Sequence, residues 1–155
     1  DFARGEVSEP LEDADINGII ARLSETTGRR SEPLKLTLGN LPPVRIHRKA
    51  LTRAIVNLLE NARKYGADPI TLKTRADGDE IQIDILDRGP GIPQSEVERL
   101  KRPFTRLESA RTDATGTGLG LAIVERIARL HKGSLELIGR EGGGLIARLK
   151  IPSGN

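Results

Sequence analysis

The sequence predicts an α+β fold: a two-layer α/β sandwich with about three main helices packed on one face of a mixed, five- to six-stranded sheet. Apolar residues recur at helical spacing in three segments and alternate with polar residues in several shorter ones. Two pairs of these shorter segments are separated by glycine-containing turns, so each pair is expected to form a hairpin. Hairpins interrupt a regular βαβ alternation, which favours helices gathered on one face of the sheet.

The composition fits one soluble globular domain. Hydrophobic residues make up 36% of the 155 positions and charged residues 30%. With two Phe, one Tyr and no Trp, the core must be built from Leu, Ile, Val and Ala. The absence of cysteine excludes disulfides, thiolate metal sites and cysteine catalysis. No apolar run approaches the ~18 residues of a membrane span, so any anchor of a parent protein is expected outside this segment.

The charge pattern argues against nucleic acid as a partner. The formal net charge of +3 suits either a polyanionic ligand or an ordinary solvated surface. Lys and Arg form no dense stripe, however, and no aromatic residues alternate with them to stack on bases. Nucleic-acid binding is therefore not expected.

The first elements are expected over residues 16–46. Asp15 is placed to cap a helix over 16–27, whose isoleucines and leucine share one face and which stops at Gly28. Alternating apolar and polar residues predict a strand over 34–38. A short extended segment over 44–46 follows a turn that contains glycine and two prolines.

The most strongly periodic helix is predicted over 48–65, and Gly66 follows it as a stop signal. Its apolar stripe consists of Leu51, Ile55, Leu58, Leu59 and Ala62. Strands over 70–75 and 80–86 then form a hairpin around the turn at 77–79.

The remaining chain alternates between loops and regular elements. A loop over 89–93 and a short helix over 94–101 precede residues 103–118, which lack apolar periodicity. An aperiodic segment of that length is typical of a functional part of a compact domain. A helix over 119–131 and strands over 134–139 and 144–150 complete the prediction, with the glycines at 142–144 between the strands.

Three groups of residues suggest chemistry. Asn57 and Asn61 are four apart on the long helix and project from the same side. Amide oxygens there suit Mg²⁺, which prefers oxygen ligands; alternatively, backbone groups or water satisfy both amides. Lys64 and Tyr65, one turn later, offer a phosphate contact and a flat surface.

The second and third groups are glycine-rich turns. Asp87, followed by Gly89 and Gly91, is placed to accept a hydrogen bond from an exocyclic amine beside a planar ring, although such turns are common without that role. Residues 115–121, before the last helix, offer backbone amides to phosphate. They match neither the P-loop nor the dinucleotide fingerprint, and the H-R-D and D-F-G motifs of protein kinases are missing.

Taken together and in order, four motifs resemble one family. They are N-L-L-E-N-A-R-K-Y at 57–65, D-R-G-P-G-I at 87–92, R-P-F-T-R at 102–106 and G-T-G-L-G-L at 116–121. They resemble the N, G1, F and G2 boxes of the ATP-binding catalytic (HATPase_c) domain of sensor histidine kinases, within the GHKL superfamily. The G-T-G-L-G-L-A-I-V run is most similar to EnvZ-like osmosensor kinases.

This resemblance implies the Bergerat fold, with ATP and Mg²⁺ as cofactors and an ATP lid over about 103–117. It implies that Asn61 ligates Mg²⁺, that Asp87 binds the adenine amino group and that the catalytic set is Asn61, Lys64 and Arg106. The implied cofactor-binding residues are Asn57, Asn61, Arg63, Lys64, Tyr65, Asp87, Gly89, Gly91, Ile92, Phe104, Thr115, Gly116, Thr117, Gly118, Leu119, Gly120 and Leu121.

One position separates activities within the superfamily. ATP-hydrolysing relatives such as gyrase B, Hsp90 and MutL carry a general-base glutamate one turn before the Mg²⁺ asparagine, where this chain has Asn57. Asparagine cannot deprotonate water at neutral pH, and Glu60 is rotated by ~100° from Asn61. A histidine kinase is therefore expected. The alternatives are a hydrolysing GHKL ATPase and an anti-sigma serine kinase.

The resemblance also implies domain limits and partners. Residues 1–14 are expected to be a linker from an upstream phosphoacceptor and dimerisation domain, and 15–152 the catalytic domain. His47 and His131 lack the sequence context of a phosphoacceptor, so that histidine is expected elsewhere. The expected partners are that domain and the receiver domain of a response regulator. The parent is expected to be a membrane-anchored dimer, with this segment soluble, monomeric and cytoplasmic.

Overall fold

The computed structural model describes residues 9–27, 34–67, 69–91 and 119–153. Its helices are α1 (Ile16–Thr27), α2 (Arg48–Tyr65) and α4 (Leu119–Leu130). Its strands are β1 (Glu12–Ala14), β2 (Lys35–Leu38), β3 (Val44–Ile46), β4 (Thr71–Asp77), β5 (Glu80–Leu86), β6 (Ser134–Gly139) and β7 (Leu145–Pro152). The helix expected over 94–101 and the lid expected over 103–117 lie outside the described residues.

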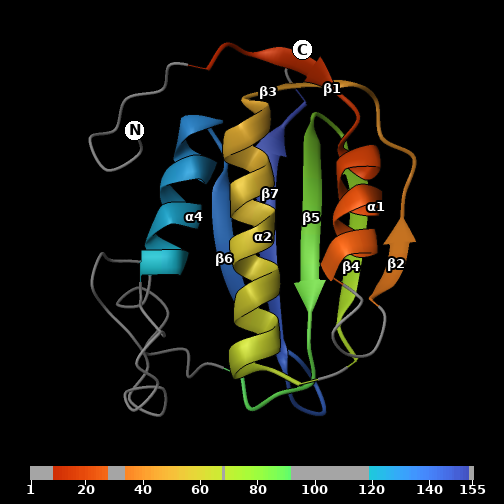
Figure 1. The fold of residues 1–155 in the computed structure, drawn as a ribbon, viewed down its shortest axis with the longest axis vertical. Coiled ribbons are helices and arrows are strands. Elements are labelled where there is room, and N and C mark those ends of the chain that lie inside the picture. The colour runs from red at the N-terminus through yellow and green to blue at the C-terminus, as the bar shows by residue number, and fades with distance from the viewer. Residues whose placement is uncertain (1–8, 28–33, 68, 92–118, 154–155) are drawn as a thin grey trace.

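A five-stranded mixed sheet with the order β2-β4-β5-β7-β6 forms one layer. β2 pairs with β4 in parallel, and the other pairings are antiparallel, including the hairpins β4–β5 and β6–β7. The three helices lie side by side on one face of this sheet (Figure 1). The α+β sandwich predicted from the hairpins and the three periodic segments is therefore confirmed.

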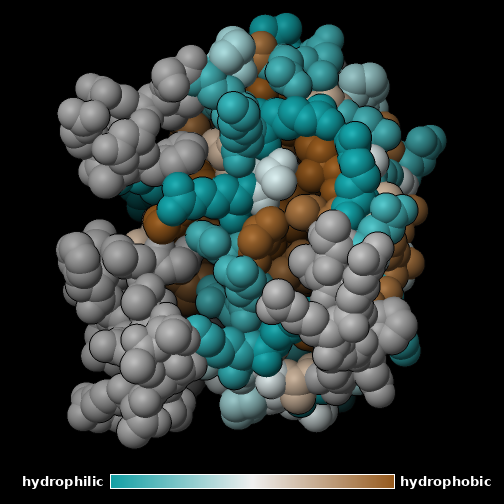
Figure 2. Space-filling view, viewed as in Figure 1, coloured by the Kyte–Doolittle hydropathy of each residue, from teal (hydrophilic) through white to brown (hydrophobic). Residues whose placement is uncertain are grey.

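The core lies between the helices and the sheet. Ile81, Ile83 and Ile85 alternate along β5 and are almost completely buried, as is the predicted apolar stripe of α2. Burying each such side chain contributes about 1.5–3 kcal/mol. On the helical face, polar side chains cover the outer surface of α2 and apolar ones show between the helices (Figure 2). Within the described ranges no helix has the length and apolarity to cross a bilayer.

Several element boundaries differ from the sequence prediction: β2 and β7 each begin one residue later, and β4 runs over 71–77 instead of 70–75. α4 ends at Leu130 instead of 131, because Lys132 adopts φ 62° and the Gly133 N–H bonds the Ala128 carbonyl at 2.7 Å, which closes a Schellman turn. β7 continues to Pro152 because Ile151 and Pro152 still pair with β5. The short segment over 44–46 is β3, which pairs with β1 in a separate two-stranded sheet.

Candidate nucleotide-binding site

The C-terminal half of α2 carries the predicted amide pair. Asn57 and Asn61 are both half-buried, whereas Glu60, between them, is exposed. Arg63 and Lys64 occupy the last turn, where positive charge is favourable to the helix dipole. Lys64 is exposed, and Tyr65 is half-buried at the end of the helix. The predicted residues of this box therefore share one end of α2.

Asp87 is buried at the end of β5, with 4% of its surface exposed. Its Oδ1 accepts a hydrogen bond of 2.8 Å from the Gly89 N–H, which closes the turn. Burial raises the pKa of Asp87 above its usual value of 3.8, against the lowering effects of the Gly89 N–H, the backbone at Leu145 and the Arg140 guanidinium. In the described part of the chain, the backbones of Gly89 and Leu145 are therefore the hydrogen-bonding partners of a largely desolvated carboxylate.

Close backbone contact joins the end of α2 to this turn. A Cβ atom on Gly66 would lie 2.6 Å from the Ala62 carbonyl oxygen and 2.7 Å from Asp87 Oδ1. A Cβ atom on Gly89 would lie 2.7 Å from the Gly66 carbonyl carbon. Real Cβ atoms do not tolerate such distances, so only glycine allows the two segments to touch. The amide face of α2 and the buried carboxylate are thereby brought to the same end of the sandwich.

The turn between β6 and β7 supports Asp87, a role not predicted from the sequence. Arg140 Nη1 donates to the Asp87 carbonyl at 2.8 Å, and Arg88 Nη1 donates to the Glu141 and Gly143 carbonyls at 3.0 and 3.1 Å. Gly144, at φ 114°, packs against the backbone of Asp87. The run of three glycines is the sequence signal for this contact, although by itself it predicts only a hairpin turn.

Several predicted site residues are not placed beside this cluster. Ile92, Phe104, Arg106 and residues 115–118 lie outside the described residues. Leu119 and Gly120 are the first residues of α4. Leu121 is half-buried and packs against the hydrophobic core. Gly91, with φ 79°, closes the described part of the turn, and a Cβ atom there would lie 3.0 Å from the Gly144 carbonyl oxygen.

The metal-binding chemistry available here is that of amide oxygens. The described ranges contain no cluster of three or more His, Cys, Asp or Glu side chains that could hold a metal ion. A hard cation such as Mg²⁺ can nevertheless bind through one or two protein oxygens, with phosphates and water completing its shell. The half-buried amides of Asn57 and Asn61 fit that pattern.

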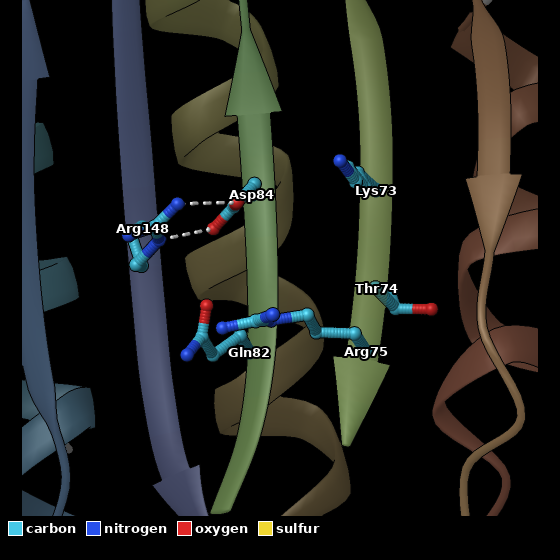
Figure 3. A pocket seen from close by; sticks show the side chains of 6 residues that line it. All are labelled: Lys73, Thr74, Arg75, Gln82, Asp84 and Arg148. Atoms are coloured by element: carbon cyan, nitrogen blue, oxygen red, sulfur yellow. Dashed lines mark hydrogen bonds and ion pairs between the residues drawn. The ribbon is translucent and has the colours of Figure 1, made fainter. Parts of the chain in front are cut away.

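A separate polar pocket of about 180 Å³ lies on the sheet face opposite the helices (Figure 3). Arg148 binds Asp84 through two hydrogen bonds of 3.0 and 3.1 Å, while Lys73 and Arg75 project from β4 on the same face. Gln82 is also buried there, with its Oε1 lacking a hydrogen-bond partner. None of the described residues predicted for nucleotide binding lines this pocket.

Comparison with known proteins identifies the family. Residues 46–155 match the family described as histidine kinase-, DNA gyrase B-, and HSP90-like ATPase. The chain is 43% identical over 106 residues to the sensor-like histidine kinase SenX3 of Mycolicibacterium smegmatis, a match that covers 66% of this chain and 27% of SenX3. The chain therefore spans about a quarter of that relative's length.

Solved structures agree with this assignment. Full-length ShkA in complex with AMPPNP matches with a TM-score of 0.83 and 25% identity over 99% of this chain and 34% of ShkA. The histidine kinase domain of the Escherichia coli osmosensor EnvZ matches with a TM-score of 0.72 and 34% identity over 96% of this chain and 92% of that domain. The chain belongs to the histidine kinase-, gyrase B- and HSP90-like ATPases, as the catalytic ATP-binding domain of a sensor histidine kinase.

Proposed function

We propose that this domain binds Mg-ATP where α2 meets the Asp87–Gly91 turn, and that it presents the γ-phosphoryl group to a histidine on a separate dimerisation domain. The observation that carries the proposal is the buried Asp87 carboxylate, held against Gly66 and Gly89 with Oδ1 bonded to the turn. The carboxylate would accept a further hydrogen bond from an adenine amino group. The glycines leave room for the flat ring.

The side chains of α2 are proposed to bind the phosphates. Asn61 would hold Mg²⁺ with support from Asn57, and the ion supplies charge neutralisation on the transferred group. Arg63 and Lys64, in the last turn of α2, would bind phosphate oxygens. Tyr65, at the end of the helix, would border the adenine ring. The AMPPNP in the ShkA complex supports nucleotide binding by this fold. Arg106 and the 115–121 segment remain proposed contacts.

Transfer is favoured over hydrolysis because the described part of α2 presents no general base on the side of Asn61. The position one turn earlier is Asn57, and Glu60 is exposed. A hydrolysing ATPase is the alternative from the same family. That alternative would be supported if the domain releases phosphate steadily and Glu60→Ala abolishes the release. Phosphorylation of a serine protein substrate with labelled ATP would instead support an anti-sigma serine kinase.

The proposed partners follow from the relatives. SenX3 is named a sensor-like histidine kinase, and we infer an upstream dimerisation domain that supplies the histidine. A response-regulator aspartate would then take the phosphoryl group. The parent is proposed to be a membrane-anchored dimer with this domain, 15–152, on its cytoplasmic side, and with residues 1–14 as the connection.

Calorimetric titration with AMPPNP tests the site. Wild-type binding should require Mg²⁺, and Asn61→Ala and Asp87→Ala should each weaken it about tenfold or more, since each removes a hydrogen bond or ligand to a charged group. Glu60→Ala is the matched control on the same helix and should leave affinity unchanged. Binding that is independent of Mg²⁺ and insensitive to both variants would contradict the site.

A further inference from the structure

The start of α2 has no cap of its own. His47 occupies the N-cap position without a side-chain hydrogen bond to the helix, and the first turn contains no acidic residue. That turn instead begins with Arg48 and Lys49, whose charges oppose the positive end of the helix dipole. The first backbone N–H groups of a helix need acceptors from elsewhere. A partner outside the helix is therefore required.

Glu9 provides the cap from the N-terminal segment. Its Oε2 accepts the Lys49 N–H at 2.6 Å, and its Oε1 accepts the Ala50 N–H at 3.2 Å. These are the second and third residues of the helix, the two positions that an N-cap side chain normally bonds. The carboxylate also places negative charge at the positive end of the dipole. Glu9, forty positions before Lys49, therefore caps the N-terminus of α2.

The segment that carries Glu9 is held by β1. Glu12, Asp13 and Ala14 pair with β3, immediately before α2. Ion pairs Arg48–Glu12 at 3.6 Å and Arg45–Asp13 at 3.9 Å accompany the ladder, but they are exposed and contribute little. The strand pairing and the Glu9 cap therefore fix where the chain enters the domain.

Two histidines extend this contact to α4. His47 Nδ1 donates to the Glu9 carbonyl at 2.9 Å, and the His47 backbone N–H donates to His131 Nε2 at 3.0 Å. Because His131 Nε2 accepts, its Nδ1 carries the proton and donates to the Ile127 carbonyl at 2.9 Å. The rings meet edge to face with centroids 5.3 Å apart. The N-terminal segment, the start of α2 and the end of α4 are thereby joined.

We propose that Glu9, β1, His47 and His131 form a clasp through which the N-terminal segment positions the α2–α4 pair at the nucleotide site, with Glu9 as the positioning residue. The two helices pack against each other and run in opposite directions (Figure 1). The clasp holds one end of the pair, and Asn57 and Asn61 lie in the C-terminal half of α2, away from the clasp. Because α2 and α4 pack against each other, a displacement of the pair at the clasp also displaces the half of α2 that carries Asn57 and Asn61. This inference rests on the proposed nucleotide site.

Hydrogen exchange of the Lys49 and Ala50 amides tests the cap directly. Glu9→Ala should reduce their protection about two- to thirtyfold, the range expected for loss of a cap. Glu9→Gln keeps one acceptor oxygen and should restore part of the protection. Glu12→Gln is the matched control, because it removes the same charge from the same segment but leaves the cap intact. Unchanged protection in Glu9→Ala would overturn the proposal.

AMPPNP titrations of the same variants test the coupling. Glu9→Ala should weaken binding severalfold at unchanged stoichiometry, Glu9→Gln should recover part of the affinity, and Glu12→Gln should match wild type. Coupling is reciprocal, so saturating Mg-AMPPNP should raise the protection of the two amides in wild type. If Glu9→Ala loses amide protection but binds AMPPNP with wild-type affinity, Glu9 acts only as a helix cap, and the proposed coupling is overturned. Failure of wild type to bind would count against the proposed function instead, while the exchange result stands.

Discussion

At the scale of single residues, the most consequential group is a carboxylate buried where it has few partners. Burial raises the pKa of Asp87 above 3.8, which means that its charged form costs stability at neutral pH. Within the described ranges, only the Gly89 and Leu145 backbones and the Arg140 charge offset this burial. A buried charged group that costs folding stability is typical of a binding site.

Asp87→Asn should separate stability from binding. Replacing the buried charge by a neutral amide that can still accept from Gly89 should keep or raise the free energy of unfolding at neutral pH. AMPPNP affinity should fall about tenfold or more, because an amide is a weaker acceptor than a carboxylate. Denaturant unfolding and calorimetry of the same sample measure both. A large loss of stability with unchanged affinity would assign Asp87 a structural role.

His131 predicts a pH dependence of stability. Burial is the main cause that lowers its pKa below 6.5; nearby His47 adds to the effect, while Glu9 and the Ile127 carbonyl oppose it. The unfolded chain therefore binds a proton more readily, so this contribution is fully present above 6.5 and is lost as the pH falls through the folded pKa.

Urea unfolding at a series of pH values measures this effect. His131→Gln, whose amide oxygen can accept the His47 N–H, should lack the part of the slope just below 6.5. The charged groups that act on the His131 ring are Glu9 and His47. Other basic residues lie close to these in the chain: Arg48, Lys49 and Lys132. An identical slope in the variant would assign the pH dependence to those groups.

At the scale of elements, the periodic segments were predictable and their contacts were not. The limits of α1, α2 and β5 match the prediction because apolar spacing alone defines them. β3 was predicted as an extended segment, yet its partner, β1, lies in the range assigned to a linker. Three residues with little apolar character give no strand signal, and pairing forms because β3 offers an open edge.

Gly66 shows the same limit, since the sequence predicts it only as the stop of α2. Gly66→Ala should cost about 1–3 kcal/mol of unfolding free energy, because the new methyl group meets the Ala62 carbonyl and the Asp87 carboxylate. It should also weaken AMPPNP binding by displacing Asp87. Gly139→Ala is the matched control: no atom lies within 4 Å of its Cβ position, so its effect should stay within about 0.5 kcal/mol. Thermal unfolding and calorimetry measure both variants.

At the scale of the whole molecule, we propose that this domain binds the nucleotide and that another domain carries the acceptor histidine. Both nitrogens of the buried His131 are hydrogen-bonded, and His47 Nδ1 bonds Glu9. Neither ring is therefore presented as a nucleophile.

Labelled ATP tests this division of labour. The domain alone should incorporate no label, and a fusion to an acceptor domain from a related sensor kinase should become labelled on that domain's histidine. The label should be stable to alkali and lost in acid, as expected for a phosphohistidine. Asn61→Ala in the fusion should abolish labelling. Incorporation by the domain alone would contradict the proposal.

The sequence by itself determined the fold class, the four boxes and the order of the described elements from α1 onward, because helical and strand periods and box residues are local properties. Only the tertiary structure decided what those residues touch. It placed Gly89 against Gly66, Arg140 on the Asp87 carbonyl, and Glu9 on the start of α2. These contacts join segments up to 53 positions apart, and no local pattern encodes them, since they depend on the path of the backbone through the sandwich.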